Sequence, residues 1–205
     1  MNIKPYLNIL DKLYPNAQCS LIYHRDYELL IAVMLSAQTS DKAVNQVTKI
    51  LFKKYPSLNK LKKAKLIDIE KIIHPLGMYK NKSKNILEIA KALNGSVPHS
   101  HQKLMKLNGV GNKTANVVLA ELYHFPFLAV DTHVMRIAKR MKWVNINDSP
   151  LIIEKKLTKL IPSKDLIKVN HQLIEFGRHI CKAKKPQCET CNFAKINKGK
   201  CYEEK

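Results

Sequence analysis

The stretch LNGVGNKTANVVLAELY, residues 107–123, contains two glycines separated by one residue, followed directly by a run with helical apolar spacing. A short helix is expected before it, in SHQKLMKL at residues 100–107, with Ser100 as its N-cap. Glycine adopts backbone conformations that other residues avoid and lets a ligand approach the main chain closely. The stretch therefore predicts two helices joined by a tight glycine turn.

A nucleotide-binding loop is one alternative for GVGNKT, residues 109–114. A P-loop requires G-x-x-x-x-G-K-[ST], and Asn112 stands where that motif needs its second glycine. The strand that should precede a P-loop is missing as well. The dinucleotide fingerprint G-x-G-x-x-G fails because Thr114 occupies its last position. Both nucleotide-binding alternatives are therefore weak.

The remaining interpretation is a turn whose backbone N–H groups face outward. Those of Gly109, Val110 and Gly111 would lie at the positive end of the second helix, where they would bind one phosphate of a DNA backbone. Such binding does not depend on the base sequence. An ordinary turn between two helices, without a ligand, explains the spacing about as well.

Helical periodicity extends over nearly the whole chain. Apolar residues recur at helical spacing, or form a continuous run suited to a buried helix, in 27–38, 41–55, 83–93, 114–123, 133–141, 151–161 and 166–176. Segments rich in Gly, Pro, Asn and Ser separate them, and the sequence has no clear alternating strands. We therefore predict an all-α fold of eight to ten short helices. The basic run KLKKAK, residues 60–65, is interpreted as a solvated helix face.

The net charge of the 205-residue chain is +20, from 36 Lys and Arg against 16 Asp and Glu. This charge favours a polyanionic partner, most simply nucleic acid. A compositional bias is the alternative, because only four of the basic residues are arginines and the chain is rich in Asn and Ile. The sequence has no apolar run long enough to span a membrane and no signal-peptide core, so we expect a cytoplasmic protein without a membrane partner.

Four of the five cysteines fall near the C-terminus with the spacing C-x6-C-x2-C-x9-C: Cys181, Cys188, Cys191 and Cys201. In a cytoplasmic protein such a group indicates a metal site rather than disulfides. The spacing does not distinguish zinc from an iron–sulfur cluster, because both accept four cysteines. Cys19 stands apart and is expected to be a small buried hydrophobic residue.

The loop KAKKPQ lies between the first two of these cysteines. Held at both ends by a metal site, it would present Lys182, Lys184 and Lys185 to DNA phosphates. A structural and electrostatic role for the metal site is therefore more economical than redox catalysis.

LNGVGNKTANVVL, followed by AVDTH at residues 129–133, resembles the helix-hairpin-helix and Gly/Pro–Asp element of the endonuclease III superfamily of DNA glycosylases. Further similar segments are LLIAVMLSAQTSD (29–41), GMYKNKSKNI (77–86), FGRHIC (176–181) and the terminal cysteines. The resemblance covers nearly the whole chain. The chain departs from the family pattern at Asn108, where proline is usual and the turn would be slightly less rigid. It departs again in the last cysteine gap, which is four residues longer than in the family's C-x6-C-x2-C-x5-C.

The resemblance implies two helical domains flanking a DNA-binding cleft. Residues 19–125 would form a six-helix barrel that contains the hairpin, and residues 1–18 with 126–205 a helical domain with one [4Fe–4S] cluster per chain. The four terminal cysteines would bind the cluster, with a bulge in NFAKINKGK (192–200) allowing Cys201 to take part. The implied partner is duplex DNA with a damaged pyrimidine or an abasic site, bound by a monomer that is nucleoid-associated in a bacterium.

In this family the lysine of G-V-G-x-K and the aspartate of V-D-T-H line one cleft, and the matching residues are Lys113 and Asp131. The implied reaction flips the damaged nucleotide out of the duplex, and the carboxylate stabilises oxocarbenium-like charge on the sugar. The lysine amine attacks C1′ and forms a Schiff base, and elimination of the 3′ phosphate then cuts the strand. The resemblance also suggests that Gln38 and Met78, which is leucine in the family, fill the space left by the flipped base.

Both proposed catalytic residues also have simpler interpretations. Lys113 lies near the first turn of a helix, where the dipole disfavours a cation and, with partial burial, favours the neutral, nucleophilic amine. A surface lysine that tolerates a small cost would explain the same position. Asp131 is a suitable N-cap for a helix over 132–142.

Two other functions compete with a bifunctional glycosylase and lyase for oxidised or saturated pyrimidines. An adenine-mismatch glycosylase of the same superfamily typically lacks the hairpin lysine, has a catalytic Glu in the early helix and carries an extra C-terminal domain. Here Lys113 is present and 29–38 contains no Glu, so this alternative is weaker. A non-catalytic DNA-binding module would explain the charge, the hairpin and the cysteines, but would leave the pairing of Lys113 with Asp131 as coincidence.

Overall fold

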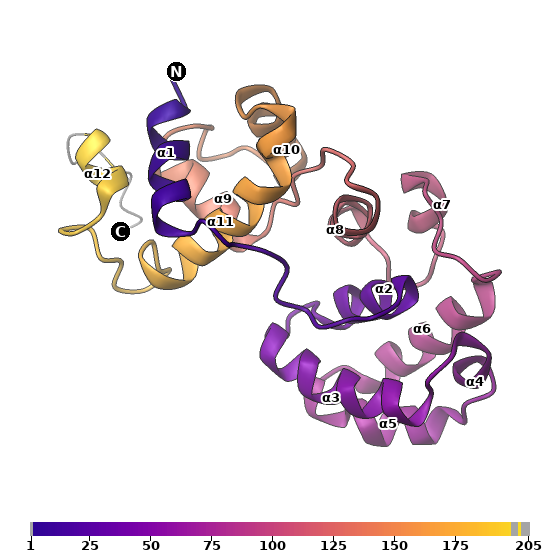
Figure 1. Ribbon diagram of the computed structural model, residues 1–205. Helices are drawn as coiled ribbons and strands as arrows, with labels where there is room; N and C mark the ends of the chain where they lie inside the picture. The colour runs from indigo at the N-terminus through magenta and orange to yellow at the C-terminus, as the bar shows by residue number, and fades with distance from the viewer. Residues whose placement is uncertain (1, 198–200, 202–205) are drawn as a thin grey trace. The chain divides into compact units, whose positions relative to one another are not determined.

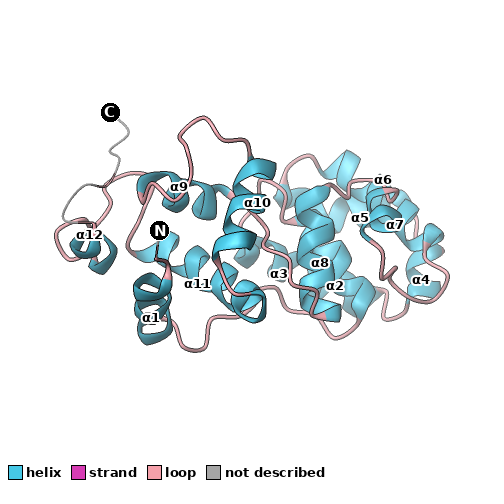
Figure 2. Ribbon diagram, turned by 90° about the horizontal axis from the view of Figure 1, so that it is seen from above, coloured by secondary structure: helices cyan, strands magenta, loops and turns pink. Residues whose placement is uncertain are grey.

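The structure, a computed structural model, describes residues 2–197 and 201, and every regular element in that part is a helix (Figures 1 and 2). The predicted all-α class is confirmed. The described residues form twelve α-helices and two 3-10 helices, so the predicted number of eight to ten was too low. Several helices have only five to eight residues, too few to show a clear period in the sequence. None of the described helices is long and apolar enough to cross a membrane.

The chain divides into two compact units, residues 19–123 and residues 1–18 with 124–205. The first unit contains α2 (Asp26–Leu35), α3 (Asp41–Lys54), α4 (Leu58–Lys62), α5 (Leu66–Ile73), η1 (His74–Leu76), α6 (Tyr79–Ala92), α7 (His101–Met105) and α8 (Asn112–Tyr123). The second unit contains α1 (Lys4–Leu13), α9 (Thr132–Arg140), α10 (Pro150–Leu160), η2 (Ser163–Asp165), α11 (Leu166–His179) and α12 (Asn192–Ile196).

Helix α2 forms the centre of the first unit. Its residues from Tyr27 to Leu35 are all buried, and it packs against α3, α6 and α8 (Figure 1). A helix covered on all sides requires the continuous apolar run that the sequence shows. Glu28 is the polar exception, because its carboxylate accepts the His24 N–H at 2.8 Å and pairs with Arg25 at 2.8 Å. The buried charge therefore ties down the start of the helix.

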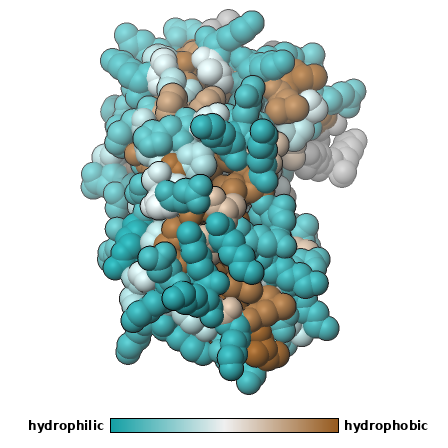
Figure 3. Space-filling view, turned by 90° about the vertical axis from the view of Figure 1, so that its right-hand side faces the viewer, coloured by the Kyte–Doolittle hydropathy of each residue, from teal (hydrophilic) through white to brown (hydrophobic). Residues whose placement is uncertain are grey.

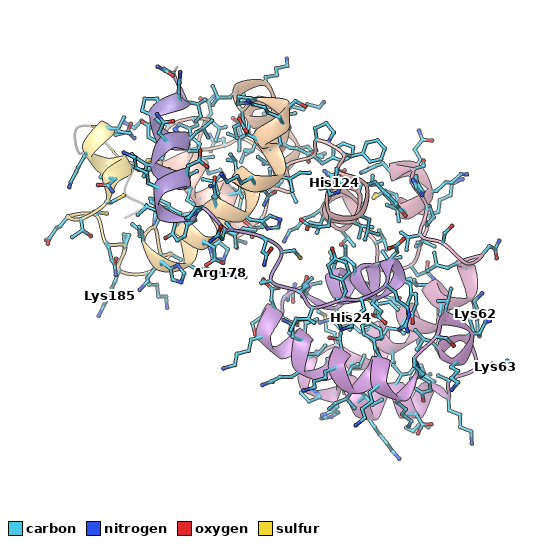
Figure 4. All side chains as sticks on the ribbon, in the orientation of Figure 1. His24, Lys62, Lys63, His124, Arg178 and Lys185 are labelled. Atoms are coloured by element: carbon cyan, nitrogen blue, oxygen red, sulfur yellow. The ribbon has the colours of Figure 1, made fainter. Side chains whose placement is uncertain are left out.

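The basic run at residues 60–65 is not one helix face, so that prediction was wrong. Helix α4 ends at Lys62, and Lys65 is already the N-cap of α5. Lys62, labelled in Figure 4, is half-buried and donates a hydrogen bond to the Leu93 carbonyl at 2.8 Å, where α6 ends. A run of lysines carries no information about where a helix stops, whereas Leu61 within the run is fully buried.

The second unit is organised around α11, which packs against α9 and α1, while α12 packs against α1. An aromatic group holds α12 in place. The Phe193 ring stacks on Phe176 with centroids 4.2 Å apart and meets Tyr6 edge-on at 5.0 Å. Because Phe176 and Phe193 are fully buried, the last described helix is part of the core.

Candidate functional site

The glycine turn joins α7 and α8, as the sequence predicts. The Val110 N–H donates to the Leu107 carbonyl at 3.1 Å, and the Val110 side chain is buried. Gly109 has a φ of 78°, a left-handed conformation that glycine adopts readily. A Cβ atom at Gly109 would lie 2.4 Å from the Asn85 side-chain nitrogen, so the turn also needs glycine for space.

One part of the predicted phosphate site is wrong. Because the Val110 N–H is bonded within the turn, it is not one of three outward donors. Gly109 and Gly111 are both exposed, and the Gly111 carbonyl accepts the Ala115 N–H at 2.9 Å at the start of α8. A Cβ at Gly111 would meet open space, so nothing in the described protein itself requires glycine at this position. A side chain at position 111 would therefore have room in the free protein.

Asn108, the residue that replaces the family's usual proline, has a contact that the sequence did not suggest. Its side-chain amide donates to the Glu88 carboxylate on α6. The turn is therefore tethered to the body of the first unit, which offsets the rigidity that proline would have supplied. A hydrogen bond to a charged acceptor typically contributes about 1.5–3 kcal/mol when shielded, and less for an exposed pair such as this one.

Lys113 is the second residue of α8 and directly follows the turn. Its side chain is exposed, so the partial burial that the sequence analysis expected is absent from this structure. The position at the positive end of the helix is as predicted. The Lys113 amine is therefore accessible to solvent at this end of the helix.

Asp131 is the N-cap of α9, as predicted. Its Oδ1 accepts the backbone N–H groups of His133 and Val134, each at 2.8 Å, and Oδ2 takes part in neither bond. The preceding segment is held by α11, because the buried Asn170 side chain accepts the Ala129 N–H at 2.6 Å. The carboxylate therefore has a fixed position and one oxygen outside the capping bonds. Asp131 lies in the second unit and Lys113 in the first.

The close approach of α9 and α11 explains the glycine in FGRHIC. A Cβ at Gly177 would lie 2.7 Å from Nδ1 of His133, so any larger residue would push the helices apart. Arg136 on α9 bridges the two helices, because its Nη2 donates to the Gly177 carbonyl of α11 at 3.0 Å. The same nitrogen lies 3.1 Å from His133 Nδ1. Burial lowers the pKa of His133 despite the opposing effect of the Asp131 carboxylate, and the positive charge of Arg136 lowers it further. Burial and the neighbouring guanidinium therefore disfavour a positive charge on the imidazole beside Asp131.

Gln38 and Met78, the two expected wedge residues, both lie on exposed loops of the first unit. Gln38 follows α2 and has a φ of 56°, and Met78 precedes α6 and has a φ of 46°. Residues other than glycine rarely adopt this left-handed conformation, which costs of the order of 1–3 kcal/mol. Both loops are therefore held in strained shapes that display these side chains.

The terminal cysteines lie close enough to influence one another. Burial raises the pKa of the Cys191 thiol, and the neighbouring Cys181 and Cys188 sulfurs raise it further. Burial and these three sulfurs likewise raise the pKa of Cys201. Within residues 2–197 and 201, however, no three His, Cys, Asp or Glu side chains are arranged to hold a single metal ion.

The longer gap before Cys201 is partly explained by α12. Residues 192–196 of the expected bulge are helical, and a helix advances only about 1.5 Å per residue. Part of the extra length is therefore taken up by this helix. The Cys191 sulfur is still close enough to raise the pKa of the Cys201 thiol. Residues 198–200 of the same predicted bulge lie outside the described residues.

Two arginines that the sequence analysis did not single out hold the cysteine loop from α9. Arg136 Nε donates to the Cys181 carbonyl at 2.9 Å. Arg140 is buried, and its Nη1 donates to the Lys182 carbonyl at 2.7 Å and lies 3.5 Å from the Cys181 sulfur. Their signal in the sequence is the i, i+4 spacing in the otherwise amphipathic run HVMRIAKRM.

The three lysines of the KAKKPQ loop are all exposed, as expected: Lys182, Lys184 and Lys185. Lys185 has a φ of 52° and its side chain points away from the ribbon (Figure 4). The isolated Cys19 is half-buried, and burial raises its pKa to about 11. It is therefore protonated and unreactive at neutral pH, in agreement with the predicted role as a small hydrophobic residue.

Comparisons with known proteins give a consistent picture. Residues 31–163 match the model of the HhH-GPD superfamily base excision DNA repair proteins. The chain is 41% identical over 198 residues to endonuclease III of Bacillus subtilis, covering 93% of this chain and 90% of the relative. It is 44% identical over 193 residues to endonuclease III of Rickettsia felis, covering 92% and 90%. Among solved structures it is similar to a trapped endonuclease III–DNA covalent intermediate, with a TM-score of 0.92, 42% identity and coverage of 98% and 94%.

Proposed function

Because the chain belongs to the endonuclease III family of HhH-GPD base excision DNA repair proteins, we propose that it removes oxidised or saturated pyrimidines from duplex DNA and then cuts the strand at the abasic site. It is a DNA glycosylase and abasic-site lyase, and its macromolecular partner is DNA. A single chain carries every residue that the reaction needs, so we expect it to act as a monomer, bound to chromosomal DNA.

DNA is held first by its backbone. The turn at Gly109 and Gly111 and the positive end of α8 offer a site for one phosphate. The net charge of +20 adds attraction that does not depend on sequence, and hydrophilic side chains cover most of the face drawn in Figure 3. The damaged nucleotide is then flipped out of the duplex, and Gln38 and Met78 occupy the space that it leaves.

The chemistry begins when the Lys113 amine attacks C1′ of the flipped nucleotide. The C1′–N bond to the base breaks, the base leaves with the bonding electrons and takes up the proton that the attacking amine loses, and the Asp131 carboxylate stabilises the positive charge on the sugar. Ring opening gives an iminium between Nζ and C1′. Loss of a C2′ proton then expels the 3′ phosphate by β-elimination, and water releases the lysine.

The placement of Lys113 is the observation that carries this proposal. It is exposed, at the positive end of α8, and two residues after Gly111, so a phosphate held by the turn would bring the adjacent sugar toward its amine. The similar endonuclease III structure is of a covalent intermediate with DNA, which supports a covalent route.

Borohydride trapping tests the proposed function. The protein is incubated with duplex DNA containing thymine glycol and reduced during turnover, and a covalent protein–DNA band is expected because borohydride converts the iminium to a stable amine. Base release and strand cutting are measured in parallel. If neither thymine glycol nor an abasic site yields a band or a cut strand, the proposal is wrong.

The two hairpin glycines are expected to respond differently to alanine. Gly109→Ala should lower the free energy of unfolding by about 1–2 kcal/mol, because its φ of 78° is strained for alanine and Asn85 must move. Gly111→Ala should change stability by less than about 0.5 kcal/mol but weaken binding to undamaged duplex about ten-fold, because its methyl group stands where the phosphate binds. Denaturant titration and DNA-binding isotherms separate the two effects. Unchanged binding by Gly111→Ala would count against the phosphate site.

A [4Fe–4S] cluster is the proposed cofactor, as in the endonuclease III family generally. Its ligands would be the four terminal cysteines, and the residues present fit it. The thiols of Cys181 and Cys191 are buried, and that of Cys201 is half-buried. The Arg140 guanidinium lies beside the Cys181 sulfur, where it would offset the negative charge of four thiolates. The cluster would organise the loop between Cys181 and Cys188.

The proposed cluster can be tested by the iron and sulfide content of the protein, without measuring activity. Protein purified without oxygen should be brown and contain about four irons and four sulfides per chain. Cys201→Ala should lose iron on dilution, whereas Cys19→Ala, which removes a thiol of the other unit, should retain it. Zinc in a colourless protein would contradict the cluster, and full retention of iron by Cys201→Ala would remove that residue from the ligand set.

The KAKKPQ loop is expected to contribute phosphate contacts. Replacing Lys182, Lys184 and Lys185 together with alanine should reduce the slope of log K against log salt by up to about 3, roughly one for each lost contact. The effect should be the same for damaged and undamaged duplex, because phosphate contacts carry no base information. Binding isotherms at several salt concentrations measure the slope. A slope equal to that of the unaltered protein would place the loop away from DNA.

A further inference from the structure

Lys82 is a buried lysine with no assigned role, in the first turns of α6. Only 4% of its surface is exposed. Its ammonium donates hydrogen bonds to three oxygens: the Ala37 carbonyl at 3.0 Å, the Thr39 hydroxyl at 2.9 Å and the Leu76 carbonyl at 3.4 Å. The side chain therefore connects α6 with the loop after α2 and with the end of η1.

A lysine is a costly choice for this position. No carboxylate among the residues that the structure describes forms an ion pair with it, and burial lowers its pKa. It also lies near the positive end of its own helix, which disfavours a cation. The Ala37 carbonyl, which accepts from the ammonium, lies just beyond the C-terminal, negative end of α2. The negative end of that helix offsets part of the cost of burying the charge. A structural core position would be filled more cheaply by an apolar residue.

The two segments that Lys82 connects are the two that display the proposed wedge residues. Gln38 stands between Ala37 and Thr39, both of which accept from the ammonium. Met78 lies two residues after Leu76, and its carbonyl accepts the backbone N–H of Lys82 at 3.0 Å. One residue thus fixes both loops, with its side chain and with its main chain.

The left-handed backbone conformations of Gln38 and Met78 must be held by contacts from other residues. Gln38 and Met78 have φ values of 56° and 46°, and both side chains are exposed, so their own packing cannot hold the backbone there. Thr39 adds one further link, because its hydroxyl donates to the Leu76 carbonyl at 3.1 Å. The ammonium and the Thr39 hydroxyl therefore join the two loops directly.

We propose that Lys82 is a positioning residue for base flipping, whose ammonium holds the loops of Gln38 and Met78 together in the shape that inserts into DNA. This inference rests on the proposed function, since it gives those two side chains their task. Lys82 does not touch the reacting atoms. It acts by fixing the backbone on either side of the wedge before DNA arrives, and a misplacement of about 1 Å at such a site slows a reaction by up to about 100-fold.

Lys82→Met tests the inference, because methionine has a similar length and no hydrogen-bond donor. The single-turnover rate of thymine glycol release should fall about 10–100-fold. Affinity for undamaged duplex should be unchanged, because the phosphate grip is elsewhere. A 2-aminopurine placed opposite the damaged base should show a smaller fluorescence rise than with the unaltered protein, since the wedge enters poorly.

Lys62→Met is the matched control. Lys62 is also a lysine of the first unit that donates to a main-chain carbonyl, that of Leu93 at the opposite end of α6. The same substitution there removes a lysine charge and one hydrogen bond to a main-chain carbonyl. It should lower the melting temperature by less than Lys82→Met does, and it should leave the rate of base release and the fluorescence signal unchanged.

A double-mutant cycle separates positioning from general loss of stability. Lys82→Met and Gln38→Ala should be non-additive, with the double variant about as slow as the slower single variant, because both remove the same insertion step. If the two losses multiply, or if Lys82→Met releases base as fast as Lys62→Met, the inference is wrong. If the unaltered protein itself releases no base, it is the proposed function that fails.

Thr39→Val provides a second route should Lys82→Met fail to fold. Valine has nearly the shape of threonine but neither accepts from the ammonium nor donates to the Leu76 carbonyl. The rate of base release should fall in the same direction by a smaller factor, about 3–10-fold. A rate equal to that of the unaltered protein would overturn the proposal.

Discussion

Replacing Lys113 with alanine is expected to abolish the borohydride-trapped complex and to lower the single-turnover rate of base release by at least about 10³-fold. The reason is that the amine forms the bond to C1′, and no other group in the proposed mechanism can take that role. Strand cutting should be lost with it, because β-elimination requires the iminium. Gel separation of reduced complexes and of labelled DNA products measures both.

The same substitution should leave the fold intact, because the Lys113 side chain is exposed. The melting temperature of Lys113→Ala should therefore match that of the unaltered protein within a few degrees. Lys103→Ala is the control for charge, since Lys103 is another exposed lysine on α7, beside the same hairpin. It should trap DNA normally. Retention of the trapped band by Lys113→Ala would move the nucleophile to another residue.

Asp131→Asn is expected to reduce base release by about 10²–10³-fold while changing stability little. Asparagine is as good an N-cap as aspartate, so the two hydrogen bonds from His133 and Val134 should persist. What asparagine cannot supply is the negative charge opposite the developing positive charge of the sugar. Single-turnover kinetics and denaturant titration, performed on the same preparation, measure the two effects.

Asp131→Ala completes that comparison. It removes both the charge and the cap, so it should lose activity to a similar extent and also lower the free energy of unfolding by about 1 kcal/mol. If Asp131→Asn were fully active, the carboxylate would be only a helix cap. If the two variants differed greatly in rate, the orientation of α9, rather than charge, would dominate.

The helical class and the hairpin could be predicted because they depend on local patterns. The apolar run over α2 and the two glycines of the turn are visible without any knowledge of distant contacts. The N-cap role of Asp131 is local in the same way. Contacts between distant segments were not predictable, and these decide which of the local groups are available for function.

Val110 and Lys113 are two groups whose availability could not be predicted from the sequence, the first in the main chain and the second in a side chain. The sequence places both at the mouth of a helix, but only the folded turn shows that the Val110 N–H is already bonded to Leu107. Partial burial of Lys113 was inferred from its expected chemistry, whereas exposure depends on which elements pack nearby.

Lys82 shows the opposite case, in which a signal was present and overlooked. It lies four residues before Ile86 and seven before Ile89, on the apolar face of α6, where a lysine is unexpected. Its partners come from two other segments, so its role could not be read from α6 alone. A charged residue on a buried helix face is a reason to search for distant oxygens that would accept from it.

The identity of the nucleophile is the central claim, and mapping the covalent bond tests it most directly. The complex trapped with thymine glycol duplex is reduced, the DNA is digested away, and the protein is cleaved and analysed by mass spectrometry. The mechanism predicts a reduced sugar remnant on Nζ of Lys113, in the peptide that contains GVGN, and on none of the other 31 lysines of the chain. A remnant on any other residue, or a trapped band that persists in Lys113→Ala, would contradict it.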